Sequence, residues 1–258
     1  MKPIIHSCCL ALLSLVLVFT ATAGQAADTR CFEMRTYYAA PGKLDAVQAR
    51  FRDYTCKCFE KHGMTNIGYW LPLENPDNKL VYVLAFPSRE AATASWKAFM
   101  ADPDRQAYFK KTEANGKILD KIESVFLKAT DFSPEVKPCC AAAPRTFELR
   151  TYKASGKNLP NLLARFRNHT CTLFEKHGVT NVAYWTPADE KKGASDTLIY
   201  IVAHKSKEAG AESFKAFRAD PEWVKVKADS EKAAGGSLTI KDGVKSVLMQ
   251  PTDFSPMK

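Results

Sequence analysis

The chain repeats its own sequence, and this duplication limits what it can fold into more than any other feature. Five short motifs of the first half return in the same order in the second half. The matched motifs lie at 32–37 and 147–152, 49–52 and 164–167, 59–63 and 174–178, 101–103 and 219–221, and 130–134 and 252–256. The spacing between partners grows from 115 residues (32 to 147) to 122 residues (130 to 252), so insertions are small and fall in loops. We therefore predict one module at 30–134, a linker at 135–145 and a second module at 146–256.

Each copy carries the pattern of a mixed α+β unit. Apolar and polar residues alternate from Phe32 to Tyr38, which predicts a half-buried strand. Residues 43–62 place apolar side chains at helical spacing, and Gly63 follows where a helix commonly ends. Further strands are expected at 66–71, 80–86 and 122–128, and a second helical stretch at 88–116, restarting at Asp102.

The order β-α-β-β-α-β is that of the ferredoxin-like unit. Helices cover only one face of such a sheet, and the other face needs a partner. Two copies in one chain can provide that partner for each other. We expect the fold to be α+β, with two ferredoxin-like modules forming a pseudo-dimeric α+β barrel within one chain; further oligomerisation remains open.

The first 26 residues have the layout of a secretory signal peptide. Lys2 supplies a positive start, 8–19 form an apolar core, and 21–27 offer small-residue cleavage points. The core is short for a membrane span, which needs about 20 apolar residues. We expect a mature protein that is periplasmic or secreted and has no transmembrane segment after signal removal.

The cysteines of the mature chain permit disulfides in an oxidising compartment. They are Cys31, Cys56, Cys58, Cys139, Cys140 and Cys171. A bridge between Cys31 and the Cys139-Cys140 pair is plausible, since each stands just before a module. Cys56 and Cys58 point to different faces of a helix, and no nearby histidine completes a tetrahedral set. We therefore expect no metal and no cofactor.

The formal net charge is +9, which could favour an anionic surface. However, the lysines alternate with acids, as in Lys110-Lys111 followed by Glu113. This pattern is typical of solvated helix faces, so we expect no nucleic-acid partner.

Several motifs together resemble the NIPSNAP family. They are EMRTY at 33–37, PGK at 41–43, RFR at 50–52, EKHGM at 60–64, GYW at 68–70 and SREAA at 88–92, most of them matched in the second copy. The resemblance covers almost the whole chain after the leader. It implies a dimeric α+β barrel fold, which the family shares with small cofactor-independent monooxygenases, but no settled reaction.

The first strand of each copy supplies a polar row. If its apolar residues pack under the helices, the polar row faces the barrel interior. One interpretation is a pocket in which arginine binds an anion and glutamate acts as acid or base. The other is a Glu–Arg network that fixes the interface between the sheets. The residues are Glu33, Arg35 and Tyr37 in the first copy and Glu148, Arg150 and Tyr152 in the second.

Histidines and strand aromatics are further candidates. His62 and His177 end matching helices, where each could transfer protons beside a cavity or simply be satisfied by the last carbonyls. His204 stands where the first copy has Phe86, which favours the second copy as the place of a specialised pocket. Aromatic residues that could line a cleft between helix and sheet, or belong to the core, are Trp70, Tyr82, Trp185 and Tyr200.

Two hypotheses follow from the sequence. The first is small-molecule binding or cofactor-independent oxygenase-like chemistry in a cleft of the barrel. The alternative is a non-catalytic interaction or scaffold protein of the cell envelope.

Overall fold

The computed structural model describes residues 28–138 and 145–258. The predicted signal segment, Cys139 and Cys140 lie outside these residues, so the expected bridge to Cys31 stays a prediction. Among the described residues, the four cysteines Cys31, Cys56, Cys58 and Cys171 form no disulfide with one another. No helix in 28–138 or 145–258 is long and apolar enough to cross a membrane.

The elements of the two modules follow the predicted order. The first module contains β1 (Cys31–Ala39), α1 (Leu44–Arg50), α2 (Cys56–Lys61), β2 (Thr65–Pro72), β3 (Lys79–Phe86), α3 (Arg89–Ala101), α4 (Pro103–Thr112) and β4 (Leu119–Ala129). The second contains β5 (Thr146–Ala154), α5 (Leu159–Arg165), α6 (Cys171–Lys176), β6 (Thr180–Pro187), β7 (Thr197–His204), α7 (Lys207–Ala219), α8 (Pro221–Ala233) and β8 (Thr239–Pro251), with a short 3₁₀ turn at Glu190–Lys192.

The predicted first helix of each module is interrupted by a π-helical segment. This segment spans Phe51–Thr55 in the first module and Phe166–Thr170 in the second. A π turn holds one more residue than an α turn, so side chains after it are rotated relative to a regular helix. Such segments often accompany functional sites, and this one borders the cavity described below.

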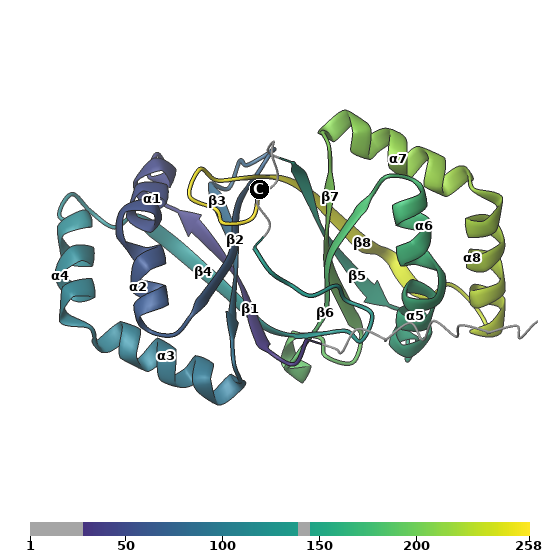
Figure 1. Ribbon diagram of the computed structural model, residues 1–258, viewed down its shortest axis with the longest axis horizontal. Helices are drawn as coiled ribbons and strands as arrows, with labels where there is room; N and C mark the ends of the chain where they lie inside the picture. The colour runs from purple at the N-terminus through teal and green to yellow at the C-terminus, as the bar shows by residue number, and fades with distance from the viewer. Residues whose placement is uncertain (1–27, 139–144) are drawn as a thin grey trace, which may run out of the picture.

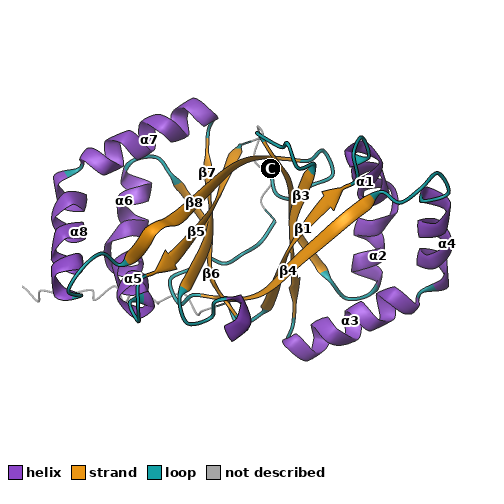
Figure 2. Ribbon diagram, turned by 180° about the vertical axis from the view of Figure 1, so that it is seen from behind, coloured by secondary structure: helices purple, strands orange, loops and turns teal. Residues whose placement is uncertain are grey.

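The eight strands close into one barrel in the order β1-β3-β2-β8-β5-β7-β6-β4. Trp70–Pro72 pairs with Met249–Pro251, and Leu127–Ala129 pairs with Trp185–Pro187, so each module contributes to both seams. The helices of the two modules lie on opposite outer flanks of the strands (Figures 1 and 2). The predicted intramolecular pseudo-dimer is confirmed.

The barrel interior is apolar rather than polar. Phe32 packs on Trp185 with ring centroids 5.8 Å apart, and Trp70 packs on Phe147 at 5.5 Å. Met34 belongs to the same buried cluster. The prediction that the polar row of the first strand faces the interior is therefore wrong. Apolar side chains fill the space where the two sheets meet, and the alternating polar residues point beneath the helices.

The repeated TDFSP motif joins the two modules. Thr252 donates its backbone N–H to the Tyr69 carbonyl at 2.9 Å, and Ser255 Oγ accepts from the Tyr69 N–H at 2.9 Å. Thr130 and Ser133 make the same two contacts to Tyr184. The end of each module therefore extends the backbone hydrogen bonding of the other.

Candidate ligand cavity

A cavity of about 490 Å³ lies in the first module, between the helices and the outer face of β1 and β4. Met100 and Ile122, both solvent-exposed, mark its mouth. Its remaining walls are mostly aromatic and aliphatic. The other lining residues are Arg35, Tyr37, Val47, Arg50, Phe51, Thr55, Trp96, Phe99, Arg105, Phe109, Glu113, Ile118 and Leu119.

Three arginines give this cavity its charge. Arg35 donates to Glu33 at 2.6 Å, and Arg50 donates to Glu113 at 2.9 Å. No carboxylate of the described residues lies within 4 Å of the Arg105 guanidinium, which stacks 4.0 Å from the Phe109 ring centroid. Three cations thus face two carboxylates, and one positive charge is left without a partner.

Buried polar atoms around the cavity also lack partners. Within the described part of the chain, the Nε atoms of Arg35, Arg50 and Arg105 and Oγ1 of Thr55 make no hydrogen bond. An unsatisfied buried donor costs roughly 1–3 kcal/mol. Burial, helped by the neighbouring charge of Arg50, lowers the pKa of Arg105 from its usual value. An anionic group in the cavity would accept hydrogen bonds from these donors and would balance the charge of Arg105.

The corresponding space in the second module is much smaller. Its volume is about 190 Å³, and its lining includes Trp223 where the first module has Arg105. The Trp223 ring lies 5.3 Å from the Arg165 guanidinium, and Arg165 matches Arg50. Thr170 Oγ1, the counterpart of the unpartnered Thr55 hydroxyl, donates to the Arg165 carbonyl at 3.2 Å. Trp223 therefore occupies the space that is open cavity in the first module.

The predicted Glu–Arg rows form buried networks under the helices. In the first module Glu33 accepts from Arg35, from Ser124 and from Trp96 Nε1 at 2.6 Å. The arginine lines the cavity, whereas the glutamate holds it in place. Tyr37 also lines the cavity, and its ring lies 5.7 Å from the Arg35 guanidinium.

The second network differs in one donor. Glu148 accepts from Arg150, from Ser246 and from His204 Nε2 at 3.0 Å. Burial by itself would raise the pKa of Glu148, but these hydrogen bonds and the charge of Arg150 lower it to about 2. His204 is 2% exposed and is thus a buried partner of a carboxylate. Arg150 also donates to Tyr152 at 3.2 Å and to Tyr200 at 2.8 Å.

The two helix-end histidines have a shared structural role. His62 Nε2 lies 2.7 Å from Asp102 Oδ2, and His177 Nε2 lies 2.7 Å from Asp220 Oδ2. Their partners are thus the aspartates that cap α4 and α8, not the last carbonyls of their own helices. Neither histidine lines the cavity of its module.

The four strand aromatics do not share a cleft. Trp70 and Trp185 fill the barrel interior, whereas Tyr82 and Tyr200 lie in the cores beneath the helices. All four are fully buried, so the core interpretation holds for them. Sequence reasoning missed Arg50, Arg105, Thr55 and Glu113 as cavity residues. The mismatch between Arg105 and Trp223, three residues after each matched Asp-Pro pair begins, was the available signal.

Fold and cavity define the class of protein: an α+β barrel of two fused ferredoxin-like modules, with a helix-covered cavity in the first. The NIPSNAP family model matches residues 32–134 and 147–256, and the chain belongs to the NIPSNAP family. No functionally curated protein matches it significantly.

Solved structures resemble the chain as single modules and as whole barrels. A NIPSNAP domain protein from Burkholderia xenovorans is 26% identical over 41% of this chain and 99% of its own, with a TM-score of 0.36. A putative monooxygenase from Fusobacterium nucleatum is 13% identical over 88% of this chain and 93% of its own, with a TM-score of 0.51. An anthrone oxidase-like protein is 11% identical over 87% and 92%, with a TM-score of 0.53. At these identities the two full-length matches show the fold alone.

Proposed function

We propose that the chain binds an organic anion with an apolar body in the cavity of its first module. The observation that carries the proposal is the half-buried guanidinium of Arg105, set among aromatic walls, which has no carboxylate partner among the described residues and whose buried Nε makes no hydrogen bond. Arginine is well suited to a carboxylate because its planar fork donates two parallel hydrogen bonds. The apolar lining would hold the remainder of the ligand.

Binding is better supported than oxygenase-like chemistry. Cofactor-independent oxygenation requires a group that takes a proton from the substrate. Glu113 is the single carboxylate among the described lining residues, and it is already paired with Arg50 at 2.9 Å. The names of the barrel neighbours add only the likeness of fold. The scaffold alternative requires no deep cavity, whereas this cavity is large enough for a small organic molecule. The leader-like segment 1–26 further leads us to propose that binding takes place outside the cytoplasm.

The proposal is tested by displacement of a fluorescent aromatic sulfonate, 8-anilinonaphthalene-1-sulfonate. Decanoate should displace the dye, whereas decanol and decylammonium at the same concentration should not. Arg105→Gln should weaken decanoate binding about tenfold, the effect of one charge-assisted hydrogen bond. Arg218→Gln removes one positive charge at an exposed position of α7 and is the matched control. Equal displacement by decanol, or equal effects of both variants, would rule out the proposed site.

A further inference from the structure

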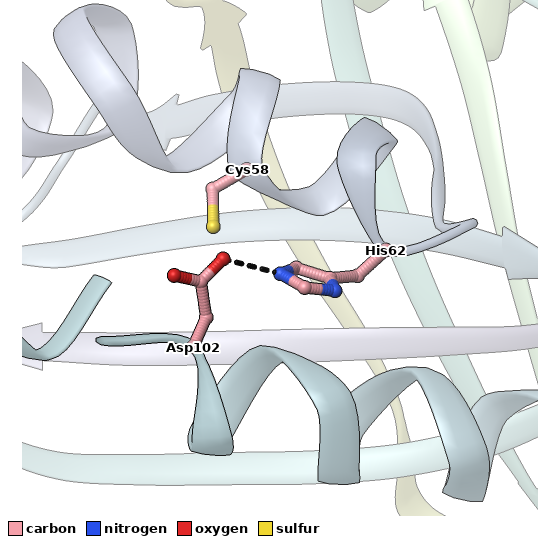
Figure 3. Close-up of side chains that lie close together, drawn as sticks. All are labelled: Cys58, His62 and Asp102. Atoms are coloured by element: carbon pink, nitrogen blue, oxygen red, sulfur yellow. Dashed lines mark hydrogen bonds and ion pairs between the residues drawn. The ribbon is translucent and has the colours of Figure 1, made fainter. Parts of the chain in front are cut away.

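Three potential metal ligands meet where α2 ends and α4 begins in the first module (Figure 3). Cys58 and His62 are four residues apart and therefore project from the same side of the helix. Asp102, which lies between α3 and α4 as the N-cap of α4, faces them from the opposite side. The Cys58 sulfur, a His62 ring nitrogen and an Asp102 oxygen all lie within 4.8 Å of one another.

The two oxygens of the aspartate have different partners. Asp102 Oδ1 caps α4 by accepting from the backbone N–H groups of Asp104 and Arg105 at 2.9 and 3.2 Å. Oδ2 instead faces His62 at 2.7 Å and Lys61 Nζ at 2.8 Å. The Lys61 side chain is 57% exposed, so it can swing into solvent without leaving a buried charge.

The second module shows which part of this cluster is additional to the fold. Lys176, His177 and Asp220 repeat the same contacts, at 2.8 Å and 2.7 Å from Asp220 Oδ2. Leu173 stands where the first module has Cys58. The His–Asp–Lys contacts are therefore sufficient to join the helices, and the thiol has no part in them. With the Cys58 thiol added to the His–Asp contact, the first module has three potential metal ligands at this point.

We propose that Cys58, His62 and Asp102 form a binding site for Zn²⁺ or a similar divalent transition metal ion. Thiolate, imidazole and carboxylate are the three donor types that zinc takes in proteins. Zinc bonds of about 2.0–2.3 Å place neighbouring ligand atoms roughly 3–4 Å apart, so small side-chain rotations suffice. The ion replaces Lys61 as the cation on Asp102 Oδ2, and the hydrogen bond of His62 becomes a metal bond. The thiol proton is released to solvent. Three protein ligands leave a fourth position for water or a small ligand.

The test is a Co²⁺ titration of the reduced full-length protein, because cobalt bound by thiolate gives a near-ultraviolet charge-transfer band. We expect the band to reach saturation at one equivalent. Cys58→Leu, which copies the second module, should fold normally and lose the band. Leu173→Cys should create a second site and raise the saturation point to two equivalents. Lys61→Ala should tighten Zn²⁺ binding several-fold, since it removes the competing cation.

Every variant keeps the other thiols and histidines, so a change in the cobalt band reports on the substituted residue alone. The proposal is overturned if the wild-type protein shows no band at stoichiometric cobalt, or if Cys58→Leu retains it. Far-ultraviolet circular dichroism of each variant confirms that the fold is intact.

Discussion

The two modules share a backbone plan but differ beneath their third helices, and the differences occur as matched sets. Glu33 receives a hydrogen bond from Trp96 on α3, whereas Glu148 receives it from His204 on β7. Phe86 occupies the His204 position in the first module, and Phe214 occupies the Trp96 position in the second. The donor has moved from helix to strand, and the carboxylate is satisfied in both cases.

A third position makes room for this exchange. Gly210 on α7 matches Ala92 on α3. A Cβ on Gly210 would lie 2.8 Å from His204 Cγ, which is too close for two carbon atoms. A buried carboxylate thus constrains its whole neighbourhood: one changed donor requires two compensating changes nearby.

The same comparison extends to the cavities. Arg105 leaves the first module open and positively charged, whereas Trp223 fills the second. The replacement of Phe86 by His204 predicted that the second module would hold the specialised pocket. Of the two corresponding cavities, the larger one lies in the first module, while His204 is a buried partner of Glu148.

The largest effect on the free energy of unfolding is expected from removing either buried glutamate, Glu33 or Glu148. Glu148→Ala leaves Arg150 and His204 without their acceptor, and Glu33→Ala does the same to Arg35 and Trp96. Breaking a buried pair from one side costs about 3–5 kcal/mol. Urea unfolding should show losses of that size for both variants. A loss below about 1 kcal/mol in one module only would show that the networks are not equivalent.

A somewhat smaller effect should appear as a pH dependence of stability. The folded-state pKa of Glu148 is about 2, against an ordinary value of 4.5. The stabilisation is therefore present above pH 4.5 and is lost as the pH falls towards 2; its size is on the order of 3 kcal/mol. The difference in unfolding free energy between wild type and Glu148→Gln should shrink over that range. The exposed Glu74→Gln is the control. A pH-independent difference would contradict the assigned network.

The smallest predicted effect on stability is that of Gly210→Ala, and its sign is opposite to the usual one. Gly→Ala within a helix normally stabilises by up to about 1 kcal/mol. Gly210→Ala should instead destabilise by about 1–3 kcal/mol, because the new methyl group meets His204. Adding His204→Phe and Phe214→Trp rebuilds the arrangement of the first module and should recover most of the loss. Thermal or urea unfolding of the single and triple variants distinguishes these outcomes, and a stabilising Gly210→Ala would refute the packing account.

Local patterns predicted the modules, their element order and the closed barrel. Alternation and helical spacing are properties of short segments, and the duplication supplied the partner for each open sheet. Which face of the first strand points into the barrel could not be predicted in the same way. Both faces of β1 are buried, one by the other module and one by helices, so alternation separates Phe32 from Glu33 without saying which face each takes.

The cavity and the cluster of Cys58, His62 and Asp102 depend on contacts between distant segments. The π-helical segment Phe51–Thr55 leaves no trace in an apolar pattern of spacing three and four. In the sequence Cys58 stands beside Cys56, whereas in the fold its neighbours are His62 and Asp102. Comparison of the two copies position by position would have marked both Cys58 and Arg105 as unmatched residues.

We propose that an organic anion with an apolar body binds the first module and not the second. Isothermal titration of decanoate into wild type, Arg105→Trp and Trp223→Ala measures this directly. Arg105→Trp gives the first module the residue that fills the second. We predict one site per chain in the wild type and in Trp223→Ala, and no binding in Arg105→Trp. Two sites in the wild type, or unchanged binding in a folded Arg105→Trp, would contradict the claim.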